Sequence, residues 1–451
     1  MNIILFYSRV KFSFQIAALN PHLTNFQIYN TSNLEEWVTT DYEHKIKPNC
    51  AVFAKGHPSS GTDSSAVELF IEFKRRSNDD PFVNNIPPQS NTPSPPATTA
   101  NPFMRSSFSG SSTCGQITSY AASHMSAQYR THMFSVLICD NDARLFRWDY
   151  SGAIVTEKFP YNTQPYLFNF FIRFDRLPRD VQGRDTTVRP ATTDETKDAV
   201  KAAQELGASK MPLLVVSVPN PATGQPLEYI IASPRASPYV PVGRWTRTSI
   251  GYDVQRKGGI FMKDSWRLVM EGARKEGIVY SRFEANGVPN VPHCSNSGDV
   301  GDDAYHSTRT DHYARKAWIA DYEYGLISQR HYCLILDGIG QPLDSFRCSR
   351  DMVRAVHAAL VYKFFLDKVE VCVSESCTPM AHKFAYKCEI LHRDISPGNI
   401  LITSDNKFEG GLLIDWDLCK DMNTQVHGPH HAVRTVRIKY LSIRWVLINW
   451  T

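Results

Sequence analysis

In the second half of the chain, the hydrophobic pattern predicts a hairpin, a buried strand and a helix. Apolar runs at 400–402 and 412–414 bracket a polar turn at 405–407, as in two antiparallel strands. The largely apolar stretch 331–336 predicts a strand buried on both faces. Residues 268–283 carry apolar side chains at helical spacing. Helices and strands mixed in this way indicate an α+β domain.

In the first half of the chain, alternation is the main signal. Residues 67–74 alternate between apolar and polar side chains, and 144–149 form a second strand with a charged face. An amphipathic segment at 197–206 precedes an apolar strand at 213–216. We therefore expect a separate α/β domain at the amino terminus.

Breaks in composition suggest where the domains end. Residues 87–113 are rich in Pro, Ser, Thr and Asn, which predicts a disordered insertion within an amino-terminal domain at 1–178. We expect a linker and transition segment at 179–227. A small lobe would then occupy 228–336, and a partial large lobe 337–451.

Two polar blocks flanking the hairpin carry the strongest chemical signal. His392-Arg393-Asp394 and Asn399 have the spacing H-R-D-x-x-x-x-N, and Asp415 follows the second apolar run. Phosphoryl transfer requires cations that neutralise the phosphate oxygens and a carboxylate that orients the attacking hydroxyl. The pattern predicts Asp394 as catalytic base, with Asn399 and Asp415 as metal ligands. A purely structural interpretation is that these residues cap turns.

A lysine and a helix glutamate should complete such a site. Lys263 ends an apolar run, where its ammonium group could bind the phosphates. Glu271 and Glu276 both lie in the predicted helix at 268–283, and we prefer Glu276 because an apolar pair follows it at helical spacing. The alternative is that both carboxylates are solvated.

The expected phosphate cradle is poor in glycine. We predict strand pieces at 242–246 and 250–254, in which Gly243 and Gly251 could let backbone amides approach the phosphates. We count Gly243 as an ATP-binding residue.

The expected hinge for the adenine follows the buried strand. Asp337 and Ile339 lie where that strand ends, so both are predicted to bind ATP.

At this point the chain resembles a known family, the fungal-type protein kinases, often called FunK. The matching segments are Gly243-Arg244, 261–266, Gly340-x-Pro342-Leu343, 391–396 and 415–417, and upstream 71–74, 80–82, 115–116 and 147–149. The resemblance implies a two-lobed protein-kinase-like fold, ATP and Mg as cofactors, and Ser/Thr hydroxyls of a protein substrate as acceptors.

The chain departs from the kinase pattern in several places. Asp417 replaces an expected glycine, and Ser396 stands where many protein kinases carry a lysine. Few residues follow Asp415, so we expect an incomplete large lobe. Residues 361–380 read as an insertion and 436–451 as an atypical tail. One hypothesis is that both are translated introns, and the alternative is a true insertion and a short natural tail.

The amino-terminal domain carries a second chemical pattern. Glu72 and Lys74 lie on one face of a predicted strand, with Asp63 upstream. This resembles the E-x-K core of restriction-endonuclease-like nucleases, in which acids bind Mg and the lysine helps to activate water. Gln116 and Tyr120, one helical turn apart, add to the likeness. The domain could equally be an interaction module or present a solvated strand face.

The composition indicates the compartment of the protein and adds little about its function. A net charge of +4 on 451 residues is too small to indicate a nucleic-acid or membrane partner. The ten cysteines form no C-x-x-C pair and read as free thiols. We expect an intracellular protein, cytoplasmic or nuclear, without a signal peptide.

Three functions remain open from the sequence. The leading one is a Ser/Thr-type protein kinase. The alternatives are a small-molecule phosphotransferase of the aminoglycoside or choline kinase type, since 414–416 fits that group too, and a non-catalytic pseudokinase or binding module.

Overall fold

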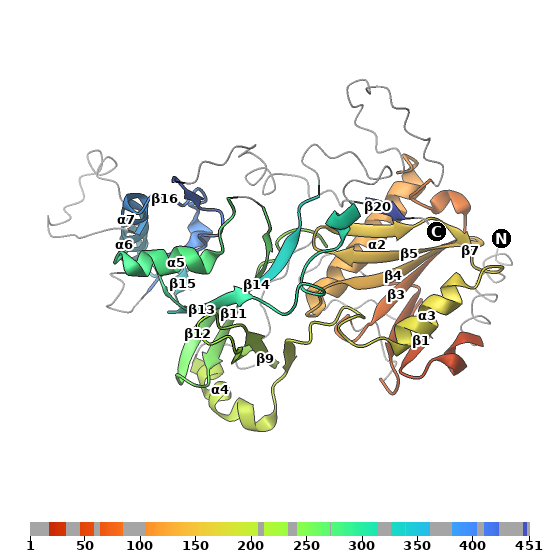
Figure 1. Ribbon diagram of the computed structural model, residues 1–451, viewed down its shortest axis with the longest axis horizontal. Coiled ribbons are helices and arrows are strands. Elements are labelled where there is room, and N and C mark those ends of the chain that lie inside the picture. The colour runs from red at the N-terminus through yellow and green to blue at the C-terminus, as the bar shows by residue number, and fades with distance from the viewer. Residues whose placement is uncertain are drawn as a thin grey trace, which may run out of the picture.

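The computed structural model contains two large sheets and a smaller group of helices and hairpins (Figure 1). It describes residues 18–32, 46–57, 64–83, 104–205, 212–232, 241–270, 272–313, 326–338, 340–360, 381–403, 410–423 and 445–448. The amino-terminal sheet lies on the right in Figure 1, and α5, α6 and α7 lie on the left. The mixed α+β content predicted from the sequence is confirmed.

The amino-terminal sheet has eight strands in the order β1-β2-β3-β4-β5-β6-β20, with β7 paired to β5. Strands β1 to β3 form an antiparallel meander, and helix α2 (Phe108–Ala127) then leads to β4, which lies parallel to β3. The strands are β1 (Phe26–Asn30), β2 (Cys50–Ala54), β3 (Leu69–Lys74), β4 (Met133–Cys139), β5 (Asp142–Asp149), β6 (Gly152–Thr156), β7 (Phe159–Pro160) and β20 (Trp445–Ile448).

Both faces of this sheet are covered by helices. Side chains alternate between the faces of a strand, so Phe70 packs with α2 whereas Leu69 and Ile71 pack on the opposite face. That opposite face meets the aromatic side chains of α3 (Tyr166–Arg176). Burial on both faces explains the nearly continuous apolar run of β4.

The second sheet has seven strands, all antiparallel, in the order β13-β14-β12-β11-β10-β9-β8. Two of its strands, β8 and β9, come from the predicted linker at 179–227, which therefore contributes to the sheet expected from 228 onward. The strands are β8 (Val188–Pro190), β9 (Leu213–Val218), β10 (Leu227–Ala232), β11 (Arg247–Asp253), β12 (Gly258–Leu268), β13 (His293–Asp299) and β14 (Gln329–Asp337), and helix α4 spans Thr193–Glu205.

The remaining elements form one hydrophobic core with the edge of the second sheet. Strands β17 and β18 form the predicted hairpin, and Trp416 lies fully buried beside it against α5. The elements are α5 (Glu276–Ala285), β15 (Gln341–Pro342), α6 (Ser349–Leu360), α7 (Ala381–Lys387), β16 (Ile390–Leu391), β17 (Ile400–Ile402), β18 (Gly411–Leu413) and β19 (Lys420–Asp421); short 3-10 helices occur at Asn20–His22, Ser77–Asp79, Thr310–Tyr313, Leu343–Ser345 and Pro397–Asn399.

Three predicted elements differ from the structure. Helix α2 begins inside the predicted disordered stretch 87–113, because Ser107 caps it by accepting a hydrogen bond from Gly110 N at 3.2 Å. The helix predicted over 268–283 begins only at Glu276, and its expected first residue, Leu268, is the last residue of β12. The strand predicted at 242–246 is wrong, because Gly243 and Trp245 have positive φ values of 121° and 46°.

Several expectations lie outside the described residues. These are the insertion at 361–380, the turn at 405–407, Asp63, Glu271, Ile339 and most of the tail at 436–451. Within that tail, β20 pairs with β6 in parallel.

Candidate functional site

Lys263 lies at the centre of a buried ionic cluster. It stands on β12 between β11 and β14 and is 5% exposed. Its Nζ lies 2.7 Å from Glu276 Oε2, 2.6 Å from Asp415 Oδ1 and 3.0 Å from Asp417 Oδ2. The structure thus brings together three residues that the sequence predicted, and adds Asp417.

Glu276 connects the lysine to the segment after the hairpin. It is the first residue of α5, and its Oε1 accepts a hydrogen bond from Trp416 N at 2.9 Å. The next residue, Gly277, donates its N–H to Tyr332 Oη at 2.9 Å, and a Cβ there would lie 1.9 Å from Ser297 Oγ. Only glycine therefore lets the helix start close enough for Glu276 to reach Lys263.

Backbone and side-chain hydrogen bonds hold the predicted catalytic loop. The fully buried His392 donates from Nε2 to Ile414 O at 2.9 Å and accepts from Asp394 N at 3.3 Å. Asn399 donates from Nδ2 to Asp394 O at 2.8 Å. These bonds place Asp394 and Asn399 beside the strand that leads into Asp415.

Two non-glycine residues in this region adopt left-handed backbone conformations. Arg393 has a φ of 70° and Asp415 a φ of 66°. Such conformations cost of order 1–3 kcal/mol and persist where the surroundings impose them, often at functional sites. Here they fall within the two sequence blocks that predicted the site.

The electrostatics of the cluster favour the charged forms of Lys263 and Asp417 but oppose ionisation of Glu276. Burial alone would lower the pKa of Lys263, but Asp415, Asp417 and Glu276 together hold it above its ordinary value. Burial raises the pKa of Glu276 to about 7, with Lys263 opposing the rise and Asp417 and Asp415 adding to it. Burial would also raise the pKa of Asp417, but Lys263 and Arg244 outweigh it and hold that pKa below its ordinary value.

The donor set fits a divalent cation. Ligand atoms of Glu276, Asp415 and Asp417 all lie within 4.8 Å of one another, and hard cations such as Mg²⁺ prefer carboxylate oxygens. Asp417 Oδ1 is buried and accepts no hydrogen bond from the described residues. An unsatisfied carboxylate oxygen at this position is what a site that binds a cation would leave.

The predicted cradle and hinge residues lie differently from expectation. The N–H of Gly243 donates to Tyr150 O in the amino-terminal domain at 2.8 Å, so this amide does not point to a phosphate site. Asp337 ends β14, and its Oδ2 lies 2.8 Å from His293 Nδ1 and 3.2 Å from Arg256 NH1. Ile339 lies outside the described residues.

Sequence reasoning assigned no role to Arg244, whose guanidinium forms an ion pair with Asp417. Two departures from the kinase pattern were visible in the sequence. Asp417 replaces an expected glycine, and Arg244 follows the glycine of a glycine-poor cradle. Paired departures of opposite charge could have suggested a contact.

The second predicted site, in the amino-terminal domain, also forms a cluster. Glu72 is 3% exposed and its Oε1 lies 3.1 Å from Lys74 Nζ. Lys74 donates to Gln116 Oε1, and Gln116 donates from Nε2 to Tyr120 Oη at 2.6 Å. Asn49 N donates to Glu72 Oε2 at 3.4 Å. Glu72 is the carboxylate that the described part of the chain supplies to this cluster.

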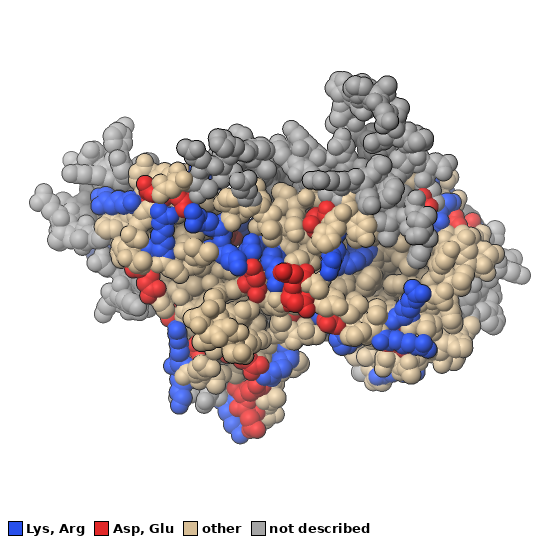
Figure 2. All heavy atoms as spheres, viewed as in Figure 1, with Lys and Arg blue, Asp and Glu red and all other residues tan. Residues whose placement is uncertain are grey.

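Charges on the face in Figure 2 alternate in sign, with acidic and basic side chains close together near the middle of the molecule.

Helices in the described ranges are all too short or too polar to cross a bilayer. The eight cysteines that lie in those ranges are free thiols.

Comparison with known proteins supports one family. A search of the curated proteins found no match. The sequence matches the family described as fungal protein kinase over residues 103–447, a span that includes α2 and both sequence blocks of the site. This match confirms the resemblance seen in the motifs, and the family implies phosphoryl transfer that uses ATP. The chain belongs to the fungal protein kinase family.

Proposed function

We propose that this chain transfers the γ-phosphoryl group of ATP to Ser or Thr hydroxyls of a protein. The observation that carries the proposal is the convergence of Lys263, Glu276 and Asp415 within 2.7 Å contacts. These groups come from a sheet, a helix and the segment after a hairpin, and the lysine–glutamate pair is the arrangement that kinases need for phosphate binding.

The residues of the site take complementary roles in the proposed reaction. Asp394 accepts the proton of the attacking hydroxyl, and His392 and Asn399 fix its backbone. Lys263 binds the phosphates and Glu276 orients it. Asp415, Asp417 and Asn399 would hold Mg²⁺, which neutralises the charge on the phosphate oxygens. Asp337 lies at the end of the strand where we place the adenine.

A transfer assay with two variants tests this function. The purified chain, Mg-ATP labelled at the γ-phosphate and a mixture of hydroxyl-bearing proteins should give labelled phosphoserine or phosphothreonine. Asp394→Asn should lower the rate by about 10²–10⁴-fold, the range for a lost general base. Nucleotide binding without transfer would instead indicate a pseudokinase. Transfer only to small molecules would indicate a phosphotransferase of the aminoglycoside or choline kinase type.

We also infer that the amino-terminal domain has a restriction-endonuclease-like fold that does not cleave nucleic acid. The meander β1–β3, the crossing helix α2 and the parallel strand β4 support the fold. Metal-assisted hydrolysis commonly uses more than one carboxylate, and the residue beside Glu72 is Asn49. Incubation with supercoiled plasmid and Mg²⁺ should leave the plasmid intact, and nicking abolished by Lys74→Ala would contradict the inference.

A further inference from the structure

The segment 241–246 replaces the glycine-rich cradle of a kinase, but its glycines serve the fold. Gly243 has a φ of 121° and gives its N–H to Tyr150 O. Gly251 lies in β11, where a Cβ would approach Ile230 O to 2.7 Å. Neither glycine is therefore present to let phosphates approach backbone amides, and another group must contact them.

The amino-terminal domain fixes this segment from both ends. Tyr150 packs edge-on against Trp245 at 5.5 Å and stacks on Trp266 at 4.1 Å between ring centroids. Trp266 N donates to Arg244 O at 2.6 Å. Arg247 NH2 donates to Gln128 O at 2.7 Å, at the end of α2. The backbone of Arg244 is thus held by the two halves of the molecule together.

From this fixed backbone, Arg244 reaches the ionic cluster. Its guanidinium pairs with Asp417, and the two side chains are 22% and 17% exposed. Both line a cleft that also includes Glu276 and Tyr332. Arg244 therefore stands at the accessible edge of the cluster, whereas Lys263 is buried inside it.

The charges suggest what happens when a nucleotide arrives with its cation. Three carboxylates, Glu276, Asp415 and Asp417, face two cations, Lys263 and Arg244, so the cluster has an excess of negative charge. A divalent cation bound by the aspartates would compete with Arg244 for Asp417. A guanidinium released in this way, on a backbone that cannot move far, is suited to bidentate phosphate binding.

We propose that Arg244 contacts the nucleotide phosphates and replaces the amides of a glycine-rich loop, with the amino-terminal domain as its support. This inference rests on the proposed kinase function. It makes Arg244 a substrate-binding residue and the docking of the two sheets a condition for nucleotide affinity.

Equilibrium binding by the full chain tests the proposal without any turnover. We would titrate the wild type, Arg244→Ala and Arg244→Lys with Mg-ATP, Mg-ADP and adenosine, and follow thermal stabilisation, which grows with ligand by mass action. Arg244→Ala should weaken Mg-ATP by about 10–100-fold, as expected for lost charge-assisted hydrogen bonds, and leave adenosine unchanged. The affinity of Arg244→Lys for Mg-ATP should lie between those of the wild type and Arg244→Ala, because lysine keeps the positive charge but loses the planar guanidinium group.

Arg189→Ala provides the matched control, since Arg189 is 42% exposed and pairs with Glu195 and Glu228 away from the cluster. It should bind all three ligands like the wild type. Equal Mg-ATP affinity in wild type and Arg244→Ala would overturn the role of Arg244 and leave the kinase proposal standing. A wild type that binds none of the three ligands would contradict both.

Discussion

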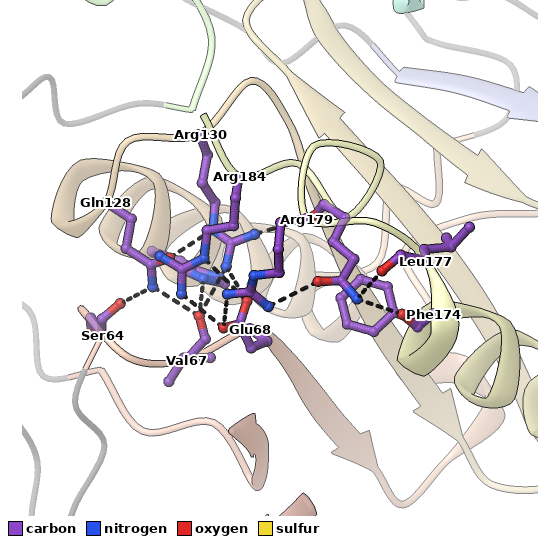
Figure 3. A network of polar contacts seen from close by, with 11 residues as sticks. Ser64, Val67, Glu68, Gln128, Arg130, Phe174, Leu177, Arg179 and Arg184 are labelled. Carbon is purple, nitrogen blue, oxygen red and sulfur yellow. Dashed lines mark hydrogen bonds and ion pairs between the residues drawn. The ribbon is translucent and has the colours of Figure 1, made fainter. Parts of the chain in front are cut away.

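Two buried clusters in this protein have opposite charge ratios. In the cluster around Lys263, three carboxylates face two cations, Lys263 and Arg244. In the amino-terminal half, one carboxylate, Glu68, faces three guanidinium groups (Figure 3). Glu68 lies 2.8 Å from Arg130, 2.7 Å from Arg179 and 2.9 Å from Arg184.

The clusters differ in how completely their polar atoms are satisfied. Arg130 also donates to Gln128 Oε1 and Gln182 O, and Gln182 itself donates to two carbonyls at the end of α3. In the Glu68 cluster both carboxylate oxygens are paired, and the network fixes the segment after α3 to β3. The Lys263 cluster instead contains the unsatisfied Asp417 Oδ1. The comparison teaches that the two clusters differ at their carboxylates: both oxygens of Glu68 are paired, whereas one oxygen of Asp417 is left open to a ligand.

The largest effect should come from breaking the structural cluster. Glu68→Ala leaves the fully buried Arg130 without its carboxylate and should lower the free energy of unfolding by about 3–5 kcal/mol. Urea denaturation measures this loss. Glu195→Ala, which breaks the exposed pair with Arg189, should leave the urea midpoint unchanged. Equal effects of both substitutions would refute a structural role for the Glu68 cluster.

The second effect concerns catalysis. Lys263→Met should lower phosphoryl transfer by about 10²–10³-fold, because a preorganised phosphate donor is lost. Binding of Mn²⁺, followed by electron paramagnetic resonance, should persist or tighten, since the three carboxylates lose one of their two cations. Loss of Mn²⁺ binding together with activity would mean that the lysine is needed to form the site itself.

The two clusters should also respond to pH in opposite directions. Burial by itself would raise the pKa of Glu68. Arg130 and Arg184 outweigh burial and hold this pKa near 2, below the 4.5 of an exposed glutamate. Its stabilisation of about 3 kcal/mol is present above pH 4.5 and is lost as the pH falls towards 2.

Glu276 shows the reverse dependence, because its pKa in the folded protein is raised to about 7. The contribution of Glu276 to the free energy of unfolding is present below pH 4.5 and is lost as the pH rises through 7. Urea midpoints from pH 8 to pH 3 for the wild type, Glu68→Gln and Glu276→Gln measure the pH dependence of stability that each glutamate causes. If Glu276→Gln gains no stability relative to the wild type between pH 5 and pH 8, the raised pKa is refuted.

The smallest effect is expected at the other lysine–glutamate pair. Lys74 is 21% exposed, and its pair with Glu72 lies on the amino-terminal sheet. Lys74→Ala should leave phosphoryl transfer unchanged, and because the buried Glu72 loses its cation it should lower stability by about 1–3 kcal/mol. The assay and the urea midpoint are those used for Lys263→Met. A large loss of transfer would show that this pair communicates with the kinase site.

The sequence predicted the local parts of the fold and site well. The hairpin of β17 and β18 and the buried strand β14 follow directly from short apolar runs. Lys263 was predicted from its place at the end of an apolar run, but in the structure it lies in the interior of β12. Glu276 was preferred because an apolar pair follows it at helical spacing, and in the structure it is the first residue of α5. The start of α5 was missed because the helical spacing of apolar residues was traced back to Leu268, which in the structure is the last residue of β12 and pairs with Gln329 of β14.

By itself the sequence determined the family and the α+β class, and it predicted most residues of the candidate site, because these depend on local spacing and alternation. Only the tertiary structure decided that Gly243 docks on Tyr150, that Arg244 meets Asp417, and that β8 and β9 join the second sheet. These features join residues far apart in the chain. The free energy of such contacts depends on which surfaces come together, and local periodicity carries no information about that choice.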